Sequence, residues 1–232
     1  MPMSQLLKVE GLSKIYNRHR PDELVALKDL SFEISAGEVV ALTGPSGSGK
    51  TTLLSLLGSM SRPTSGRIFL KDRNISNLPE RFMARLRRDS FGFVFQQYNL
   101  VRDLNVLENV MLPMYPSEQP WKEIKQAAVQ LLERFNLSAM QRKKVKLLSG
   151  GEQQRVAIAR ALIADPDIVI ADEPTAHLDL KLSEEFLAIL DALNREGKTI
   201  IIATHDPAVY EAGLIKRIIN LSHGQIDKDS AP

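Results

Sequence analysis

The segment 44–52, with the sequence GPSGSGKTT, constrains the fold of this chain more than any other segment. A glycine, four residues and then Gly-Lys-Thr is typical of a loop whose backbone N–H groups wrap a phosphate chain. The apolar run 39–42 before it predicts a buried strand, and the apolar run 53–57 after it predicts a helix. Lys50 would neutralise phosphate oxygens, and the Thr51 hydroxyl would ligate Mg²⁺. A glycine-rich turn with a solvated lysine is the alternative, but the flanking strand and helix favour an α/β nucleotide-binding fold.

Composition sets the class of protein. The 232 residues are 44% apolar and 25% charged, which is the profile of a soluble globular protein with one sizeable core, or one core and a small annexed subdomain. The net charge of +2 gives no support to nucleic-acid binding, and the absence of cysteine excludes disulfides and thiol chemistry. The first residues lack the pattern of a signal peptide, and no apolar run approaches the ~20 residues that span a bilayer. We therefore expect a cytosolic chain that shares any transport function with another polypeptide.

Two kinds of strand are predicted. Partial alternation with intervening turn residues predicts short strands at 6–9, 30–34 and 67–70. Runs that are apolar on both faces predict parallel strands covered by helices on both sides, at 39–42, 168–171 and 199–203. Each of the latter runs ends in polar residues, at the sheet edge where open α/β sheets bind ligands.

The middle of the chain, 104–162, has helical periodicity. Apolar residues from Trp121 to Phe135 recur on one helical face, and this stripe is expected to be core. The segment 216–226 predicts a terminal hairpin, and the tail after Asp227 is expected to fray.

The octapeptide 148–155, LSGGEQQR, has two interpretations that can both hold. Ser149 and Glu152 have the spacing of a capping box at the start of a helix. Gly150 and Gly151 leave bare N–H groups at the positive end of that helix, which suits an anionic phosphate.

Polar residues at two predicted strand ends are candidates for chemistry. Asp172 and Glu173 follow the run 168–171; beside a phosphate loop, the first would hold the Mg²⁺ shell and the second would polarise a water. The alternative is an ordinary strand-ending turn. His205 follows 199–203, where an imidazole could donate to a γ-phosphate, although a lone histidine is more often structural.

Gln96 and Tyr16 are candidate site residues only in combination with the motifs described above. Gln96 ends the apolar stretch 91–95, and its amide could reach a metal or a water. Tyr16 could stack on adenine, although most tyrosines serve packing.

Together, in order and approximate spacing, these motifs resemble those of ATP-binding cassette (ABC) ATPases, and the resemblance runs from Leu6 to Ile226. It implies an α/β fold: a P-loop NTPase core with a mainly parallel sheet, an N-terminal antiparallel β-subdomain and an inserted α-helical subdomain. The expected organisation is one nucleotide-binding domain over 5–228. Its core with the β-subdomain would take 5–97 and 163–228, and the helical subdomain with the signature octapeptide would take 98–162.

The resemblance also implies roles for single residues. Glu173 becomes the catalytic base, His205 the switch histidine and Gln96 the Q-loop glutamine, with Gln97 as a weaker alternative. The metal ligands would be Thr51, Gln96 and Asp172. The resemblance assigns ATP binding to four parts of the chain. These are the adenine contact Tyr16; the P-loop residues Gly44, Pro45, Ser46, Gly47, Ser48, Gly49, Lys50, Thr51 and Thr52; the signature residues Ser149, Gly150, Gly151 and Glu152; and Asp179 in the D-loop, the turn at Leu178-Asp179.

The implied function is an ATP-binding and ATP-hydrolysing subunit that powers a separately encoded membrane permease. Segments 91–100 and 106–113 resemble cassettes of lipoprotein-releasing and macrolide-efflux systems, which implies export, lipoprotein release or efflux. The implied partners are two copies of one permease or two different permeases, docked near 98–104, and a second copy of this chain around two ATP. The implied place is the cytoplasmic face of the inner membrane, with no nucleic acid bound.

Two other functions are weaker. A soluble ABC ATPase of DNA repair or translation usually carries an inserted coiled coil or a second cassette, and this sequence shows neither. An inactive nucleotide-binding regulator is disfavoured because Lys50, Glu173 and His205 are all present.

Overall fold

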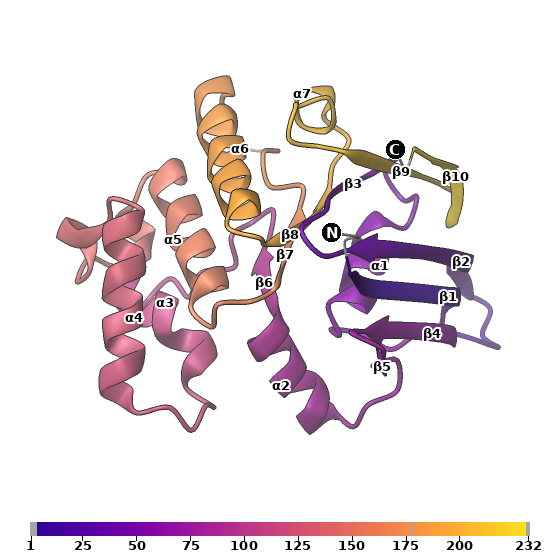
Figure 1. The fold of residues 1–232 in the computed structure, drawn as a ribbon, viewed down its shortest axis with the longest axis horizontal. Helices are drawn as coiled ribbons and strands as arrows, with labels where there is room; N and C mark the ends of the chain where they lie inside the picture. The colour runs from indigo at the N-terminus through magenta and orange to yellow at the C-terminus, as the bar shows by residue number, and fades with distance from the viewer. Residues whose placement is uncertain (1–3, 177, 231–232) are drawn as a thin grey trace.

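The computed structural model describes residues 4–176 and 178–230, which form two sheets and flanking helices (Figure 1). The strands are β1 (Gln5–Tyr16), β2 (Leu24–Ser35), β3 (Val39–Thr43), β4 (Ser65–Leu70), β5 (Arg73–Asn74), β6 (Phe91–Val94), β7 (Ile168–Asp172), β8 (Thr199–Ala203), β9 (Arg217–Ser222) and β10 (Gln225–Asp229). The α-helices are α1 (Lys50–Leu57), α2 (Glu80–Ser90), α3 (Val106–Met111), α4 (Trp121–Arg134), α5 (Gly150–Leu162), α6 (Leu180–Arg195) and α7 (Pro207–Tyr210). Short 3₁₀ turns are η1 (Leu112–Met114), η2 (Ser138–Met140) and η3 (Val145–Leu147).

The larger sheet has the strand order β10-β9-β3-β8-β7-β6. Strands β9, β3, β8, β7 and β6 are parallel, and β10 pairs antiparallel with β9. The carboxyl ends of β3, β7, β8 and β6 therefore meet at one edge, where the chain continues into the phosphate loop, Glu173, His205 and Gln96. The prediction of a mainly parallel sheet is confirmed.

Alternation along the parallel strands feeds two separate cores. In β7, Ile168 and Ile170 pack into the core shared with the antiparallel sheet and α1, whereas Val169 and Ala171 pack into the core shared with the helices. Because strand side chains point to opposite faces in turn, a strand covered on both faces must be apolar at every position. This is why the predicted strands 39–42, 168–171 and 199–203 agree with β3, β7 and β8.

The smaller sheet is antiparallel, with the order β2-β1-β4-β5. Its first two strands are 12 residues each, longer than the predicted 6–9 and 30–34. Register shifts along β1, including one between Val9 and Leu12, break the strict alternation that sequence reasoning needs. The sheet lies beside α1, opposite the helical side of the molecule (Figure 1).

The predicted helical middle is confirmed as α3, α4 and α5, which gather on one side of the parallel sheet (Figure 1). Ile124, Ala128 and Leu132 are buried as predicted. Trp121, predicted as core, is 58% exposed, because it is the first residue of α4 and its ring packs against Tyr115 with centroids 5.4 Å apart. That part of the prediction was wrong.

The carboxyl-terminal hairpin is confirmed as β9 and β10, but the predicted fraying after Asp227 is wrong up to residue 230. Asp229 accepts hydrogen bonds from both Nε and Nη2 of Arg217 at 2.8 Å, and Ser230 N–H donates to the Ile218 carbonyl. These contacts hold the last described residues against β9.

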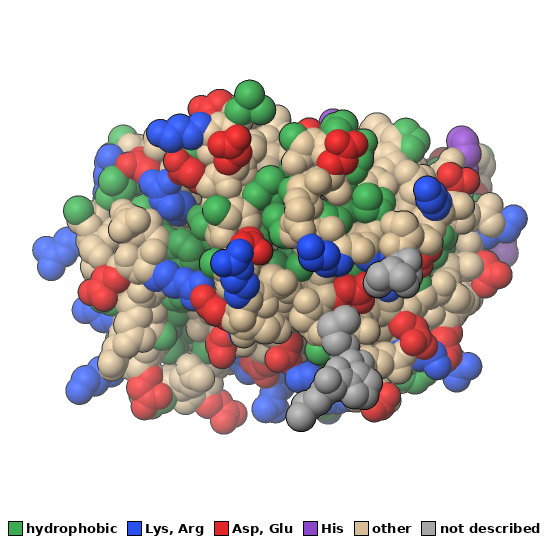
Figure 2. Space-filling model, turned by 45° about the horizontal axis from the view of Figure 1, so that its top comes forward, with side chains coloured by type: hydrophobic (Ala, Val, Ile, Leu, Met, Phe, Trp, Pro, Cys, Tyr) green, Lys and Arg blue, Asp and Glu red, His purple; other side chains and the backbone are tan. Residues whose placement is uncertain are grey.

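The described surface mixes charges. Figure 2 shows one face on which cationic and anionic side chains are interspersed, with hydrophobic side chains visible between them. Among residues 4–176 and 178–230, no helix has both the length and the apolar character needed to cross a bilayer.

Candidate active site

The phosphate loop between β3 and α1 has a backbone that needs its glycines. Gly44, Gly47 and Gly49 have φ values of 134°, 78° and 106°, which side chains rarely tolerate. A Cβ on Gly44 would lie 2.1 Å from the Leu221 carbonyl oxygen. The helix that follows begins without a side-chain cap, so its first N–H groups are available to an anion.

Lys50 lies inside this loop with only 7% of its surface exposed. Its Nζ donates to the carbonyls of Gly44 at 2.7 Å and Pro45 at 3.2 Å, and it lies 3.8 Å from Glu173 Oε1. A phosphate held by the loop N–H groups would therefore lie beside a desolvated cation.

Asp172, the last residue of β7, carries an unsatisfied carboxylate. Its Oδ1 is buried and has no hydrogen-bond partner among the described residues. Burial raises the pKa of Asp172, the Thr51 hydroxyl lowers it, and the neighbouring Glu173 charge raises it further. A buried oxygen without a donor costs free energy unless a cation or a proton meets it.

This arrangement fits Mg²⁺. The ion prefers oxygen ligands and is usually held by one or two carboxylates together with substrate phosphates and waters. Asp172 and the Thr51 hydroxyl supply two such oxygens beside the phosphate loop. Within residues 4–176 and 178–230 no group of three or more His, Cys, Asp or Glu side chains could hold a metal ion on its own.

Glu173 and His205 form a pair at the ends of β7 and β8. Glu173 Oε1 lies 2.9 Å from His205 Nδ1, and the side chains are 16% and 68% exposed respectively. Glu173 has a φ of 44°, a left-handed conformation that costs a non-glycine residue free energy. Its N–H donates to the Ala203 carbonyl at 2.8 Å, which holds the strained residue in place.

Of these residues, Lys50, Thr51, Glu173 and His205 line one cleft of about 740 Å³. The residues that were predicted from the sequence and that line this cleft are Tyr16, Gln96, Glu173, His205 and the loop residues Pro45, Ser46, Gly47, Ser48, Gly49, Lys50, Thr51 and Thr52. Gln96 lines the cleft and the alternative Gln97 does not, which distinguishes the two adjacent glutamines.

Sequence reasoning missed part of this lining. Val25, Ala26, His223 and Gly224 also contribute. The Gly224 N–H donates to the Ser48 carbonyl at 3.1 Å, so the β9–β10 turn packs against the phosphate loop. The turn residues Ser222-His223-Gly224 signalled a hairpin, but only the tertiary fold brings that hairpin to the loop.

The predicted signature residues lie elsewhere. Ser149 caps α5: its Oγ accepts from the Glu152 N–H at 3.4 Å, and Glu152 Oε2 accepts from the Ser149 N–H at 2.7 Å. The Ser149 N–H also holds the pKa of Glu152 below its usual value. A Cβ on Gly151 would lie 2.7 Å from a methyl group of Leu182, which would have to shift, whereas Gly150 faces nearly open space.

Asp179 also serves a helix start, because its Oδ1 accepts from the Leu182 N–H at 2.9 Å at the beginning of α6. The D-loop residue before Leu178, His177, lies outside the described residues. In the part of the chain that the structure describes, the cleft lining includes none of Ser149, Gly150, Gly151, Glu152 and Asp179.

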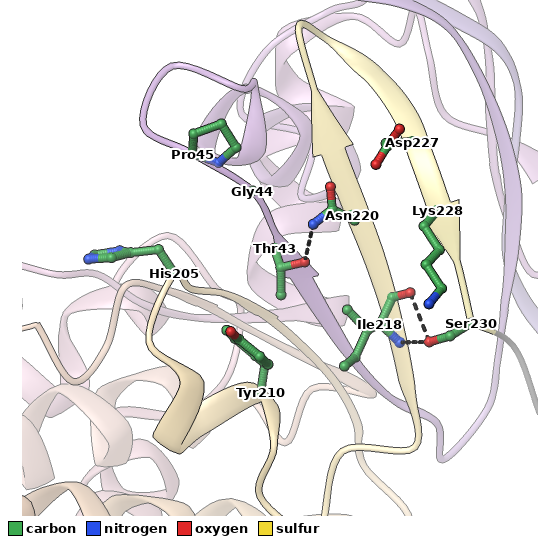
Figure 3. Close-up of a pocket in the computed structure, with 10 residues that line it drawn as sticks. All are labelled: Thr43, Gly44, Pro45, His205, Tyr210, Ile218, Asn220, Asp227, Lys228 and Ser230. Carbon is green, nitrogen blue, oxygen red and sulfur yellow. Dashed lines mark hydrogen bonds between the residues drawn. The ribbon is translucent and has the colours of Figure 1, made fainter.

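A second hollow of about 520 Å³ lies beside the start of the phosphate loop (Figure 3). It is bounded by Tyr210 and by β9 and β10 residues, and it shares Pro45 and His205 with the cleft. Asn220 Nδ2 donates to the Thr43 hydroxyl at 3.1 Å across its floor. This bond ties β9 to the end of β3, just before the loop begins.

Comparison with known proteins shows the family to which the chain belongs. The family model described as ABC transporter matches residues 27–176. An uncharacterised ABC transporter ATP-binding protein of Thermotoga maritima is 42% identical over 225 residues, which cover 97% of this chain and 95% of the relative. The macrolide export ATP-binding/permease protein MacB of Rhodopseudomonas palustris is 46% identical over 206 residues, which cover 89% of this chain but only 31% of that protein.

A solved structure agrees with the fold. The dimeric, post-hydrolysis structure of an ATP-binding cassette bound to ADP and Pi has a TM-score of 0.87 and 38% identity, and covers 97% of this chain and 98% of that one. These relatives favour a transporter subunit over the soluble ABC ATPase of DNA repair or translation. The chain belongs to the ABC transporter family, as an ATP-binding cassette that hydrolyses ATP for a transporter.

Proposed function

We propose that this cassette drives a separately encoded membrane permease from the cytoplasmic face of the membrane, in an export, lipoprotein-release or efflux system. The macrolide export relative, of which this chain spans 31%, supports that class of transport. The observation that carries the proposal is one cleft that joins the buried Lys50 cation, the Glu173–His205 pair and, beside them, the unsatisfied Asp172 oxygen.

In this proposal each residue of the cleft has a distinct task. Lys50 and the loop N–H groups bind the β- and γ-phosphates, while Thr51 and Asp172 are the residues that would hold Mg²⁺. Bound Mg²⁺ neutralises charge on the phosphate oxygens. Tyr16, half-exposed at the cleft margin, offers its ring to adenine.

Hydrolysis itself falls to the strand-end residues. Glu173 accepts a proton from the attacking water, and its strained backbone and low exposure hold the carboxylate at one position. His205 orients that carboxylate through its 2.9 Å contact and donates to the γ-phosphate. Gln96 reaches the metal or the water from the opposite wall.

Two copies would complete the site. The N–H groups at the start of α5 suit phosphate but lie outside the cleft of their own chain. A head-to-tail pair would place Ser149, Gly150 and Gly151 of one copy over ATP bound at Lys50 of the other. The dimeric cassette bound to ADP and Pi supports this arrangement. Loss of the γ-phosphate contact would then open the pair and reset the permease.

The permease contact is proposed at a groove of about 320 Å³ between α2, β6 and α5, here called the arginine groove. Its lining includes the aromatic residues Phe91, Phe93 and Phe95 and the charged residues Arg87, Arg88 and Arg160. Of the segment 98–104 that the family resemblance indicated, Asn99 contributes to the lining. A groove lined by both apolar side chains and cations suits an amphipathic helix of the permease.

The test combines catalysis with capture. The purified chain should hydrolyse Mg-ATP, and a tagged chain should co-purify with a co-expressed membrane protein encoded beside it. Arg88→Glu, in the groove, should abolish capture while ATP binding is kept. Arg142→Glu, on an exposed turn that does not line the groove, is the matched control. Equal capture by both variants would contradict the docking site, and absence of hydrolysis would contradict the function.

A further inference from the structure

The segment after Gln96 has an unusual backbone. Tyr98 and Asn99 are consecutive non-glycine residues with φ values of 57° and 48°. Two left-handed residues in a row cost free energy and persist only where surrounding contacts hold them. The segment begins beside the nucleotide cleft, which Gln96 lines, and reaches the arginine groove, which Asn99 lines.

Arg160 supplies the contacts at this point. Its Nη1 donates to the Asn99 carbonyl and its Nη2 to the Tyr98 carbonyl, both at 2.6 Å. The planar guanidinium fork matches two adjacent carbonyl oxygens that the left-handed turn points the same way. A lysine has one nitrogen and cannot reproduce this pair of parallel bonds.

The Arg160 cation is otherwise poorly compensated. Burial lowers the pKa of its guanidinium, and no carboxylate among the described residues contributes to that shift. Because arginine stays charged at neutral pH, the two carbonyl dipoles are its main compensation in the structure. The contact is thus costly to break from either side.

Arg160 also belongs to two other features. It lies in the last turn of α5, the helix whose first residues are the exposed signature glycine Gly150 and its neighbour. Its side chain lines the arginine groove. One side chain therefore touches the proposed permease groove, the segment that carries Gln96, and the signature helix.

We propose that Arg160 is a positioning residue that makes Gln96 and the signature helix move as one unit when the arginine groove is occupied. This inference rests on the proposed function and adds a mechanism of transmission to it. Occupation of the groove presses on the guanidinium, which cannot shift without moving the Tyr98 and Asn99 carbonyls. Those carbonyls are within three residues of Gln96 in the chain, so the amide moves in the cleft.

The other end of the same segment has a purely supporting anchor. Asn109 of α3 is fully buried; its Oδ1 accepts from the Val101 N–H at 2.8 Å, and its Nδ2 donates to the Val101 and Asn105 carbonyls. Asn109 lines neither the groove nor the cleft within the described residues. It is the matched control for a side chain that stabilises the segment without linking it to α5.

The test is a double-mutant cycle on ATP hydrolysis. Arg160→Lys should lower kcat about tenfold and leave KM for ATP within about twofold, which is within the range found for coupled neighbours. In the Gln96→Ala background the same substitution should change kcat less than about twofold, because Arg160 acts through Gln96. Asn109→Ala should lower the unfolding temperature, and its effect on kcat should be the same in both backgrounds.

Additive effects of Arg160→Lys and Gln96→Ala would overturn the inference. The wild-type rate in the same assay distinguishes failure of the proposed function from failure of the inference about Arg160. A wild-type chain that does not hydrolyse ATP refutes the proposed function. A wild-type chain that hydrolyses ATP, together with additive effects in the cycle, refutes only the role of Arg160.

Hydrogen exchange on the wild-type chain gives a second test that does not depend on a variant folding. Addition of Mg-ATP should change amide protection in 97–105 and in the last turn of α5 together. A change confined to one of the two segments would overturn the inference.

Discussion

At the residue scale, Lys50 and Glu173 lie 3.8 Å apart in the cleft, yet they should control different steps. Lys50→Ala removes the desolvated cation that faces the phosphates. Its affinity for Mg-ATP should fall at least about tenfold, since a hydrogen bond to a charged group contributes about 1.5–3 kcal/mol. Equilibrium binding of a fluorescent ATP analogue measures this, with Lys122→Ala on the exposed start of α4 as the control. Unchanged affinity would remove the P-loop assignment.

Glu173→Gln should bind Mg-ATP normally and hydrolyse it at least about a hundredfold more slowly, the usual scale for loss of a general base. His205→Ala should also slow hydrolysis, because the 2.9 Å contact that orients the carboxylate is lost. Phosphate release under saturating ATP measures both rates. Normal turnover by the Glu173→Gln variant would place the base on another residue.

We expect the Asp172 side chain to lower the stability of the folded protein while it enables Mg²⁺ to bind. Its folded pKa is raised, so between the unfolded and the folded pKa the folded state binds more protons and stability falls as pH rises. Asp172→Asn removes this cost and should raise the unfolding temperature at pH 7, with a difference that shrinks as the pH falls below the folded pKa and has disappeared below about pH 4, near the unfolded pKa of aspartate. The same variant should lose the Mg²⁺ dependence of ATP binding. Thermal scans across pH, with and without Mg-ATP, check both; a variant less stable at pH 7 would contradict the account.

At the element scale, two helix starts offer a matched comparison. Both α3 and α5 begin with a capping box, formed by Asn105 with Glu108 and by Ser149 with Glu152. Asn105→Ala and Ser149→Ala should each lower the free energy of unfolding by about 1 kcal/mol. Only Ser149→Ala should also slow ATP hydrolysis, since only α5 is proposed to meet a second copy's phosphate. Equal ATPase rates in the two variants would mean that Ser149 only caps its helix and has no role in ATP hydrolysis.

Some helices and strands could be predicted from the sequence, and others could not. Fully apolar strands were predicted because two cores bury them, and the α5 start was predicted because its capping box is local. Helix α2 was not predicted: it is a largely polar, amphipathic helix in which Met83 is the only fully buried residue. Helix α6 was missed although Phe186, Leu190 and Leu193 recur at helical spacing and are buried.

The site was predictable to the extent that its motifs are local. The glycine loop and the strand-end Asp172 and Glu173 follow from short patterns beside apolar strands. The contribution of His223 depends on a hairpin folding back onto the loop, and no short pattern encodes that contact. The role proposed for Arg160 depends on a contact to residues 61 and 62 positions away in sequence.

At the scale of the whole molecule, membrane association should depend on the partner. No described helix could cross a bilayer, and the described face in Figure 2 mixes charges of both signs. If the proposed permease contact holds the cassette at the membrane, the purified chain should not sediment with protein-free vesicles of anionic lipid, and should sediment with membranes only when the permease is co-expressed. Flotation of vesicles with and without the chain measures this. Strong binding to protein-free vesicles would contradict a permease-dependent location.

The proposed pairing of two copies around two ATP would give the exposed signature residues Ser149 and Gly150 a phosphate to bind, which they lack within their own chain. Its most direct measurement is size-exclusion chromatography of Glu173→Gln, which should retain ATP without hydrolysing it. We expect a monomer without nucleotide and a dimer with Mg-ATP. Adding Ser149→Arg should abolish the dimer while ATP binding is kept. A Glu173→Gln chain that binds ATP yet stays monomeric at saturating nucleotide would contradict the account.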